Sequence, residues 1–376
     1  MLDHIRYFLN TILVLVGIAG YILGGQWVWI GSVGVFIFLL LGELAIGQDE
    51  GIRNVKYPWI ADLHLYLHLP LMILLYAAYA WRIKEGFNEP TTAMTILAYA
   101  GCVITAMFMA AVPNVGIAHE LWHRKGTFQR NLGYIMGVFW GDPTRDLAHV
   151  YTHHIHVGTP KDSDTAYRGE TVYAFALRAT FGALRDAFRI EREFQKKRGR
   201  SIWSLRSRIT QAILLLALVI GSFYYVAGWL GAALVTTNLI LAKMLVEIFN
   251  YTQHYGLIRV EGTPIKDHHA WEHRTPFTRI AGSEITTHAH HHLDSDVPHY
   301  ALKPSAIDNR MPTILLCFLM SFVPPLWFWF VKKKLKKIDL LYASPEEREL
   351  AKKANEKAGW PNWFEEDAVK AVSYQN

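Results

Sequence analysis

Six long apolar runs restrict the possible folds of this chain more than any other feature of its sequence. They cover residues 7–23, 27–45, 60–81, 92–112, 209–229 and 231–250. At about 17–22 residues each, they are long enough as helices to cross a hydrocarbon core about 30 Å thick. Hydrophobic residues make up 52% of the chain and charged residues 19%. Polar segments separate the apolar runs from one another. The sequence predicts one all-α integral membrane domain (residues 1–376) with six transmembrane helices.

The segments between the spans predict the orientation of the protein. Six spans place both termini on one side, together with residues 113–208 and 251–376. These segments contain two basic clusters, at residues 185–208 and 332–337. Since basic loops stay on the cytoplasmic side of a membrane, we expect a multi-pass protein of the inner membrane with a cytoplasmic helical cap.

The basic clusters allow two interpretations. Either they set the topology and touch anionic lipid, or they attract an acidic protein partner. Nucleic-acid binding is not expected, because the topology already accounts for the charge. Cys102 and Cys317 lie in apolar runs and form no CxxC pair. No disulfide framework and no iron–sulfur centre is therefore expected within the chain.

Histidine clusters carry the strongest chemical signal. Their patterns are HxxxH, HxxxHH and HxxHH, and a further histidine follows the sixth span, giving His119, His123, His149, His153, His154, His254, His288, His291 and His292. The first pattern is expected about once by chance, whereas each of the others is expected well under ~0.1 times. Side chains four apart project from one helix face. We therefore expect His149 and His153 to reach one metal, with His154 turned toward a neighbour.

Nine imidazoles exceed the number that one metal accepts, which predicts two metals. Imidazole suits zinc, copper, iron and nickel, so the ligand type does not select iron. Structural zinc sites take four ligands and usually some cysteine, which is not available here. A metal transporter or sensor would place its ligands within the spans, whereas these clusters follow span ends. A redox di-metal centre, forming part of the cytoplasmic cap, is the preferred interpretation.

The clusters resemble the membrane desaturase/hydroxylase superfamily. The element Asn-Tyr-Thr-Gln-His-Tyr-Gly-Leu at 250–257 resembles its alkane hydroxylase branch. Segments 141–149, 162–164, 167–169 and 357–361 resemble the xylene, toluene and p-cymene methyl-monooxygenases within that branch. The resemblance covers nearly the whole chain. It implies six spans, two irons, O2 as co-substrate, and the nine histidines above as ligands.

The resemblance also implies a reaction, the O2-dependent hydroxylation of the methyl group of an alkyl-aromatic hydrocarbon. Alkane hydroxylases usually have Glu at the position of Gln253, whereas aromatic methyl hydroxylases tend to have Gln. Terminal hydroxylation of medium-chain alkanes is the main alternative. Fatty-acyl desaturation or hydroxylation is another, but desaturases lack the 250–257 element. A small hydrophobic substrate is expected to enter from the membrane lipid.

Electrons must come from outside the chain. The sequence has no CxxC pair and no Gly-x-Gly-x-x-Gly after a strand that would bind a flavin or nicotinamide. The family resemblance implies a ferredoxin-type reductase fed by NADH, with rubredoxin as the other possible donor.

Metal-bound imidazoles commonly donate their second N–H to a carboxylate. Among several candidate acids, including Asp162, we expect Asp146 and Glu247 to accept such bonds, because they lie three and seven residues before His149 and His254. His64 and His68 match no ligand position of the family, and His290 is expected to face away from its helical partners. They are expected to lie outside the metal site.

Overall fold

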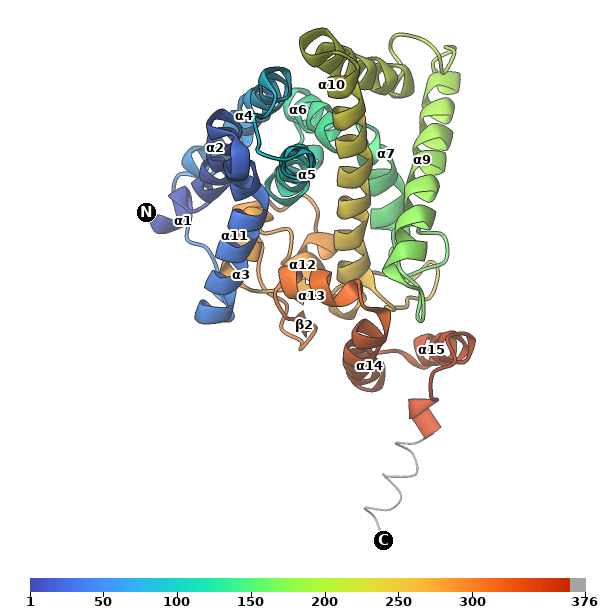
Figure 1. The fold of residues 1–376 in the computed structure, drawn as a ribbon. Coiled ribbons are helices and arrows are strands. Elements are labelled where there is room, and N and C mark those ends of the chain that lie inside the picture. Colours follow the sequence, from blue (N-terminus) through green and yellow to red (C-terminus); the bar gives the residue numbers. More distant parts are fainter. Residues whose placement is uncertain (366–376) are drawn as a thin grey trace.

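The computed structural model describes residues 1–365 and is mostly helical in that range (Figure 1). The helices are α1 (Leu2–Ile5), α2 (Phe8–Leu23), η1 (Gly25–Trp29), η2 (Ile30–Gly34), α3 (Val35–Ile46), α4 (Pro58–Glu85), α5 (Thr92–His123), α6 (Thr127–Met136), η3 (Gly137–Trp140), α7 (Arg145–Ala148), η4 (His149–His153), α8 (His154–His156), α9 (Val172–Lys197), α10 (Arg208–His254), η5 (Asp267–His269), α11 (Pro276–Ala281), α12 (His288–Leu293), η6 (His299–Ala301), α13 (Ile314–Ser321), α14 (Pro324–Leu341) and α15 (Pro345–Lys357). Strands β1 (Glu272–His273) and β2 (Arg310–Met311) pair in parallel. The predicted all-α architecture is confirmed apart from this short pair.

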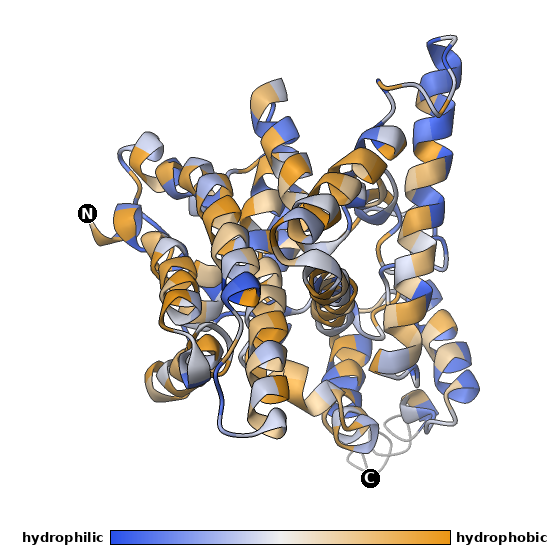
Figure 2. Cartoon of the chain, turned by 45° about the horizontal axis from the view of Figure 1, so that its top comes forward, coloured by the Kyte–Doolittle hydropathy of each residue, from blue (hydrophilic) through white to orange (hydrophobic). Residues whose placement is uncertain are grey.

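Apolar helices form the body of the molecule. Within the described residues, four helical segments are long and apolar enough to cross a membrane: Gly25–Ile46, Pro58–Glu85, Thr92–His123 and Arg208–His254. Helix α2 is also apolar but has only 16 residues. In Figure 2 the bundle helices are mostly hydrophobic, whereas α9, at the right edge, carries many hydrophilic residues.

Helix α10 contains two of the predicted spans, 209–229 and 231–250. The helical geometry is interrupted at Ala227 and at Gly228, where φ is 63°. Glycine adopts this left-handed conformation without the steric cost that a Cβ would add. The chain changes direction there, as Figure 1 shows. Helix α10 therefore consists of two helical parts, one for each predicted span, which meet at this kink.

Two spans extend further than predicted. The runs expected to end at residues 112 and 250 continue as helix to His123 and His254. Apolar composition marks where lipid surrounds a helix, but the turns beyond it are surrounded by protein. On α5, for example, Gly116, Ile117 and Ala118 are buried. These extra turns carry ligand histidines away from the apolar runs.

The helix ends that lead to the histidines gather at one end of the bundle. Arg6, before α2, pairs with Asp49, after α3, at 3.1 Å. Arg124, after α5, pairs with Asp62 in the first turns of α4 at 2.7 Å. At the opposite end, Arg82 Nε in the last turn of α4 donates to a carbonyl in the last turns of α2 at 2.6 Å. Successive helices α2 to α5 therefore alternate in direction.

Helices α14 and α15 pack against the histidine-bearing end (Figure 1). Buried Arg168 donates to Asp339 of α14 and to Asn355 of α15, each at 2.8 Å. Ser344 and Glu347 form a capping box at the start of α15. These hydrogen bonds hold α14 and α15 against the segment between α8 and α9, which contains Arg168.

Candidate metal centre

The nine expected histidines converge from four places in the fold. They come from the last turns of α5 and α10, from η4 with the start of α8, and from α12. Their ligand atoms form two groups, each with all atoms within 4.8 Å of one another. We call them the five-histidine group (His119, His123, His149, His154 and His291) and the four-histidine group (His153, His254, His288 and His292).

The division between the groups differs from the one that helical spacing predicts. His149 and His153 were expected to share a metal, but they lie in different groups, and His149 is joined by His154. Residues 149–153 form a π-helical turn. Its hydrogen bonds link residues five apart rather than four, so a side chain lies above the one five positions earlier. On α12, His288 groups with His292, four residues later, and not with His291.

Hydrogen bonds fix the tautomers in the four-histidine group. His254 Nδ1 donates to the carbonyl of His269 at 3.3 Å, and His288 Nδ1 donates to that of Ile285 at 3.0 Å. Each neutral ring then has an unprotonated Nε2. These two Nε2 atoms lie 2.8 Å apart, and each lies 3.2–3.3 Å from His292 Nε2. Lone pairs that face one another so closely fit a cation held between them.

The five-histidine group also contains imidazole nitrogens that lack a complementary hydrogen-bond partner. His154 Nε2 lies 3.0 Å from His149 Nε2 and 3.1 Å from His291 Nε2. One imidazole nitrogen carries either a hydrogen or a lone pair, so it cannot complement both neighbours. The buried Nε2 atoms of His119 and His123 have no hydrogen-bond partner. Buried polar atoms are rarely left without a partner, and this donor set also fits a metal ion.

Burial favours the neutral form of eight of the nine imidazoles, all except His153. It lowers the pKa of His149, His154, His291 and His292 well below 6.5, and the neighbouring rings lower the pKa further. Burial likewise lowers the pKa of His288 to about 3. At neutral pH each of these eight rings therefore offers a lone pair, which is the form that binds metals.

Asp162 is the carboxylate that orients a histidine. Its Oδ2 accepts from His153 Nδ1 at 2.9 Å, and both side chains are buried. Burial lowers the pKa of His153, but the charge and hydrogen bond of Asp162 outweigh this and raise the pKa. Thr165 Oγ1 also donates to Asp162, at 2.6 Å. The bond leaves His153 Nε2 free to face the other members of its group.

The expectation for Asp146 and Glu247 is wrong. Asp146 pairs with Arg208, and Glu247 accepts from Lys243, Arg145 and Asn250. Within residues 1–365 neither carboxylate bonds to a histidine. Proximity along the sequence does not fix the direction of a side chain, since Asp146 points from α7 toward the start of α10. Glu247 instead belongs to a buried network of charges.

That network lies directly beside the four-histidine group. Arg145 donates to Glu247 at 3.1 Å and to Asp164 at 2.8 Å, and Asp164 N donates to Asp162 at 3.0 Å. Lys243 Nζ lies 2.6 Å from Asp142 and 2.5 Å from Glu247. This buried network of charges is not among the features expected from the sequence. The signal was present, because a Lys and a Glu four residues apart inside an apolar run are expected to pair.

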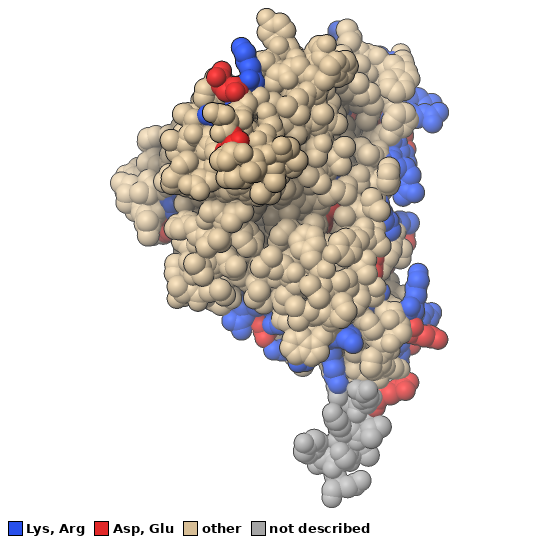
Figure 3. All heavy atoms as spheres, in the orientation of Figure 1, with Lys and Arg blue, Asp and Glu red and all other residues tan. Residues whose placement is uncertain are grey.

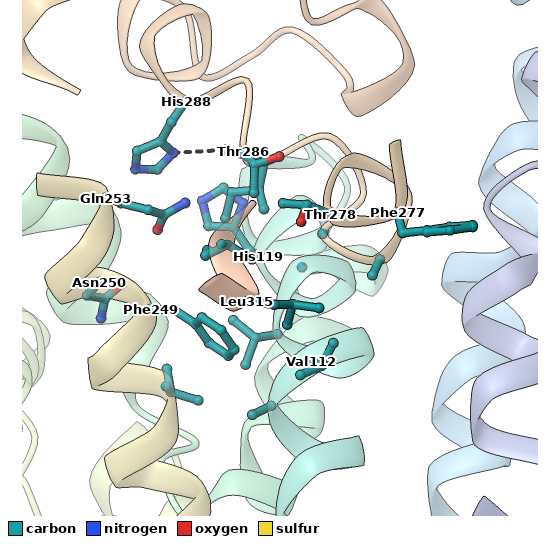
Figure 4. A pocket seen from close by; sticks show the side chains of 18 of the residues that line it. Val112, His119, Phe249, Asn250, Gln253, Phe277, Thr278, Thr286, His288 and Leu315 are labelled. Carbon is teal, nitrogen blue, oxygen red and sulfur yellow. Dashed lines mark hydrogen bonds between the residues drawn. The ribbon is translucent and has the colours of Figure 1, made fainter. Parts of the chain in front are cut away.

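An apolar cavity reaches the histidines from the bundle. Its walls come from α3, α5, α10, α11 and α13, and include Val112, Phe249, Ile314 and Leu315. Figure 4 shows His119, Gln253 and His288 at one end and Val112, Phe249 and Leu315 at the other. The backbone of α5 approaches α11 closely here, since a Cβ at Gly116 would lie 2.6 Å from the carbonyl of Gly282. The cavity connects the apolar interior of the helix bundle to the histidine-bearing end.

The remaining histidines lie outside the two groups, as expected. His64 bonds to the Ala61 carbonyl at 2.6 Å and to Ser283 at 3.3 Å. His68 is buried within α4, and His290 Nδ1 accepts from Lys303 N at 3.0 Å. Sequence reasoning did not identify a third buried cluster, in which Glu347 accepts from His268 and His269. His269 Nδ1 accepts from Lys266 N, so its Nε2 carries hydrogen and the cluster is satisfied without metal.

Comparison with known proteins agrees with this geometry. The family model described as fatty acid desaturase matches residues 94–316. The xylene/toluene monooxygenase hydroxylase component of Pseudomonas putida is 40% identical, over 99% of this chain and 100% of that protein. Alkane 1-monooxygenase 1 of Pseudomonas aeruginosa is 28% identical, over 87% and 85%. Alkane 1-monooxygenase of Acinetobacter baylyi is 27% identical, over 81% and 76%.

The matched region contains the histidine clusters, and the first relative aligns from end to end. Histidine patterns, buried imidazole groups and overall similarity all agree. The chain is an enzyme that belongs to the fatty acid desaturase family and, within it, to the membrane di-iron monooxygenases.

Proposed function

We propose that this enzyme uses O2 to hydroxylate the methyl group of an alkyl-aromatic hydrocarbon of the xylene, toluene or p-cymene type, giving the alcohol. The observation that carries the proposal is the apolar cavity that ends on both histidine groups. Its aromatic and aliphatic walls suit a small hydrocarbon. The relative that aligns over its full length is named for xylene and toluene.

We propose that each histidine group holds one iron. Two irons bound there would supply oxygen activation and C–H oxidation. With two electrons from an external donor and two protons, one oxygen atom of O2 would enter the product and the other would leave as water. The protein contributes buried imidazoles, three of them (His153, His254 and His288) oriented by hydrogen bonds at Nδ1, and a cavity that orients the methyl group. Phe249 and Leu315 line the apolar end of the cavity, away from the histidines, and this apolar lining helps to exclude water from the reacting end.

Replacing Asp162 with Asn is expected to lower the affinity for metal about 10–100-fold, the usual effect of losing such a partner. The neutral amide no longer holds the His153 ring with a charge-assisted bond. Chelator competition on the apo enzyme measures the affinity. Asp146→Asn is the matched control, because Asp146 pairs with Arg208 rather than with a histidine. Equal affinities for the two variants would exclude this role for Asp162.

The preferred substrate is tested by competition between hydrocarbons. We expect p-xylene to be oxidised faster than octane at equal concentration. Benzylic C–H bonds are weaker than those of an alkane end, and the cavity is lined by Gln253, the residue that aromatic methyl hydroxylases tend to have at this position. Gas chromatography of the alcohols measures both rates in one mixture. Faster oxidation of octane would support the alkane alternative, which the alkane monooxygenase relatives motivate.

We propose that the chain crosses the inner membrane six times, with the histidine-bearing end in the cytoplasm. The alternating directions of α2 to α5 and the break at Gly228 in α10 support this. The basic segments flanking the spans favour the cytoplasmic side. Hydrocarbon dissolved in the lipid then has a route between helices to the cavity.

We propose that a separate donor, a ferredoxin-type reductase fed by NADH or a rubredoxin, delivers electrons at this end. The relative in Pseudomonas putida is named as one component of its monooxygenase. Of the nine histidines, only His123 and His154 are half-buried rather than buried. A surface hollow lies beside His123, lined in part by Arg124, Lys125 and Asp296. A donor seated there lies next to His123 of the five-histidine group.

Lys125→Glu is expected to raise severalfold the concentration of an acidic donor that gives half the maximal rate. Lys125 is 84% exposed at the rim of the hollow. The difference from the parent enzyme is expected to shrink with salt, as the screening length falls from about 10 Å at 0.1 M to about 3 Å at 1 M. Metal content is measured alongside and stays constant. Arg192→Glu, in the other basic cluster, is the comparison, and a larger effect there would place the docking site on α9.

A further inference from the structure

Helix α9 carries an unpaired apolar stripe on its exposed side. Its members follow helical spacing and are exposed by 39–69%: Tyr173, Leu177, Phe181, Leu184 and Phe188. The helix is amphipathic, and its buried side packs on the segment that carries the histidines, where Ala187 and Ile190 contact Leu147. A contiguous apolar surface of this kind marks a contact with a partner or a membrane.

A basic stripe runs parallel to the apolar one. Arg185, Arg189, Arg192 and Lys196 are exposed, and at 3.6 residues per turn they lie about 90° around the helix from the apolar stripe. Figure 3 shows blue side chains along the edge of the molecule where α9 lies in Figure 1. A helix with adjacent apolar and basic faces is typical of helices that lie in the membrane interface.

The position of α9 agrees with a helix lying along the membrane surface. At its start, Phe175 contacts Tyr251 in the last turn of α10, with ring centroids 5.4 Å apart. Near its end, Glu191 accepts from the backbone N of Arg208, the first residue of α10, at 2.9 Å. Both ends of α10 lie at the histidine-bearing end of the fold. Helix α9 therefore spans that end, over about 39 Å, rather than crossing the bundle.

The apolar stripe is continuous with other exposed apolar surfaces at both ends. Tyr173 contacts Phe322, before α14, with ring centroids 6.3 Å apart. Phe188 contacts Trp203 at 6.3 Å, and Trp203 precedes the exposed apolar side of α10, which includes Leu214 and Leu218. The stripe thus joins the exposed apolar side of α10 to the segment just before α14.

We propose that α9 lies in the cytoplasmic leaflet of the membrane, with its apolar stripe among the acyl chains and its basic stripe on the phosphates of anionic lipids. Helices of this kind insert about 5–10 Å into the interface. Long basic side chains reach the headgroups while their stems remain on the apolar surface. The basic cluster at 185–208 is therefore assigned to lipid and not to the electron donor.

Site-specific quenching tests the proposal on the full-length enzyme in nanodiscs. A Phe181→Cys variant carries an environment-sensitive fluorophore in the stripe, and Glu193→Cys, exposed on another side of α9, is the matched control. The native Cys102 and Cys317 are buried. With nitroxide-labelled phosphatidylcholine, the label at 181 is expected to be quenched severalfold more than the label at 193. Equal quenching at both positions would overturn the proposal.

The role of charge is tested with the same label. Adding phosphatidylglycerol is expected to increase quenching at 181, and Arg185→Glu with Arg192→Glu is expected to remove that increase. Identical quenching with and without phosphatidylglycerol would overturn the assignment to anionic lipid. A label shielded from water only after a donor protein is added, or only when two copies associate, would assign the stripe to a protein partner instead. None of these readouts depends on turnover, so they remain valid if the proposed substrate is wrong.

Discussion

Replacing His291 or His153 with Ala is expected to abolish turnover and to remove metal from the enzyme. His291 belongs to the five-histidine group and His153 to the four-histidine group, so each variant damages a different metal site. Without this imidazole, the remaining histidines of the group offer one ligand too few to complete the coordination of the metal. We expect the metal content to fall from two ions per chain to about one or fewer.

Elemental analysis and product formation from p-xylene measure the two effects. His290→Ala is the matched control, because His290 lies on α12 between the ligands but accepts a hydrogen bond from Lys303 N. It is expected to retain its metal and most of its activity. His64 is a poorer control, since its ring is buried and stacks on Tyr7. One metal per chain in the active parent enzyme, or full activity of either ligand variant, would contradict the two-site arrangement.

The sequence was sufficient to predict the set of histidines but not their division. Rare patterns identified the clusters, and the family resemblance supplied the ligand positions, all of which converge in the structure. The division depends on local geometry. A π-helical turn at 149–153 sets His154 beside His149, and periodicity based on the α-helix could not foresee that. Such turns occur frequently at functional sites.

The partners of charged residues were the least predictable part of the site. Lys243 and Glu247 lie in one apolar run, which is helical as predicted. The charged partners of these two side chains, Asp142 and Arg145, lie about a hundred residues earlier in the chain. Asp162 was one of several equivalent acids in the sequence. Only the fold shows that it, and not Asp146, faces His153. Tertiary contacts of this kind leave no periodic signal in one sequence.

Replacing Arg145 with Met is expected to destabilise the apo enzyme by about 3–5 kcal/mol, the usual cost of removing one partner from a buried ion pair. Arg145 is only 3% exposed and binds both Asp164 and Glu247. Lys243 still pairs with Glu247 and Asp142 in the variant, but Asp164 is left buried without a cation. Its uncompensated charge accounts for most of the expected loss.

Two further variants separate charge from packing. Arg145→Met with Asp164→Asn removes the unpaired charge and is expected to recover much of the stability. Arg145→Lys is expected to be intermediate, because an ammonium lacks the planar fork that bonds to two carboxylates at once. Equilibrium unfolding of the metal-free protein in mixed detergent micelles measures all three. A loss below about 1 kcal/mol for Arg145→Met, the value typical of a surface pair, would mean that water reaches this network and that the charges beside His153 are not held in a dry interior.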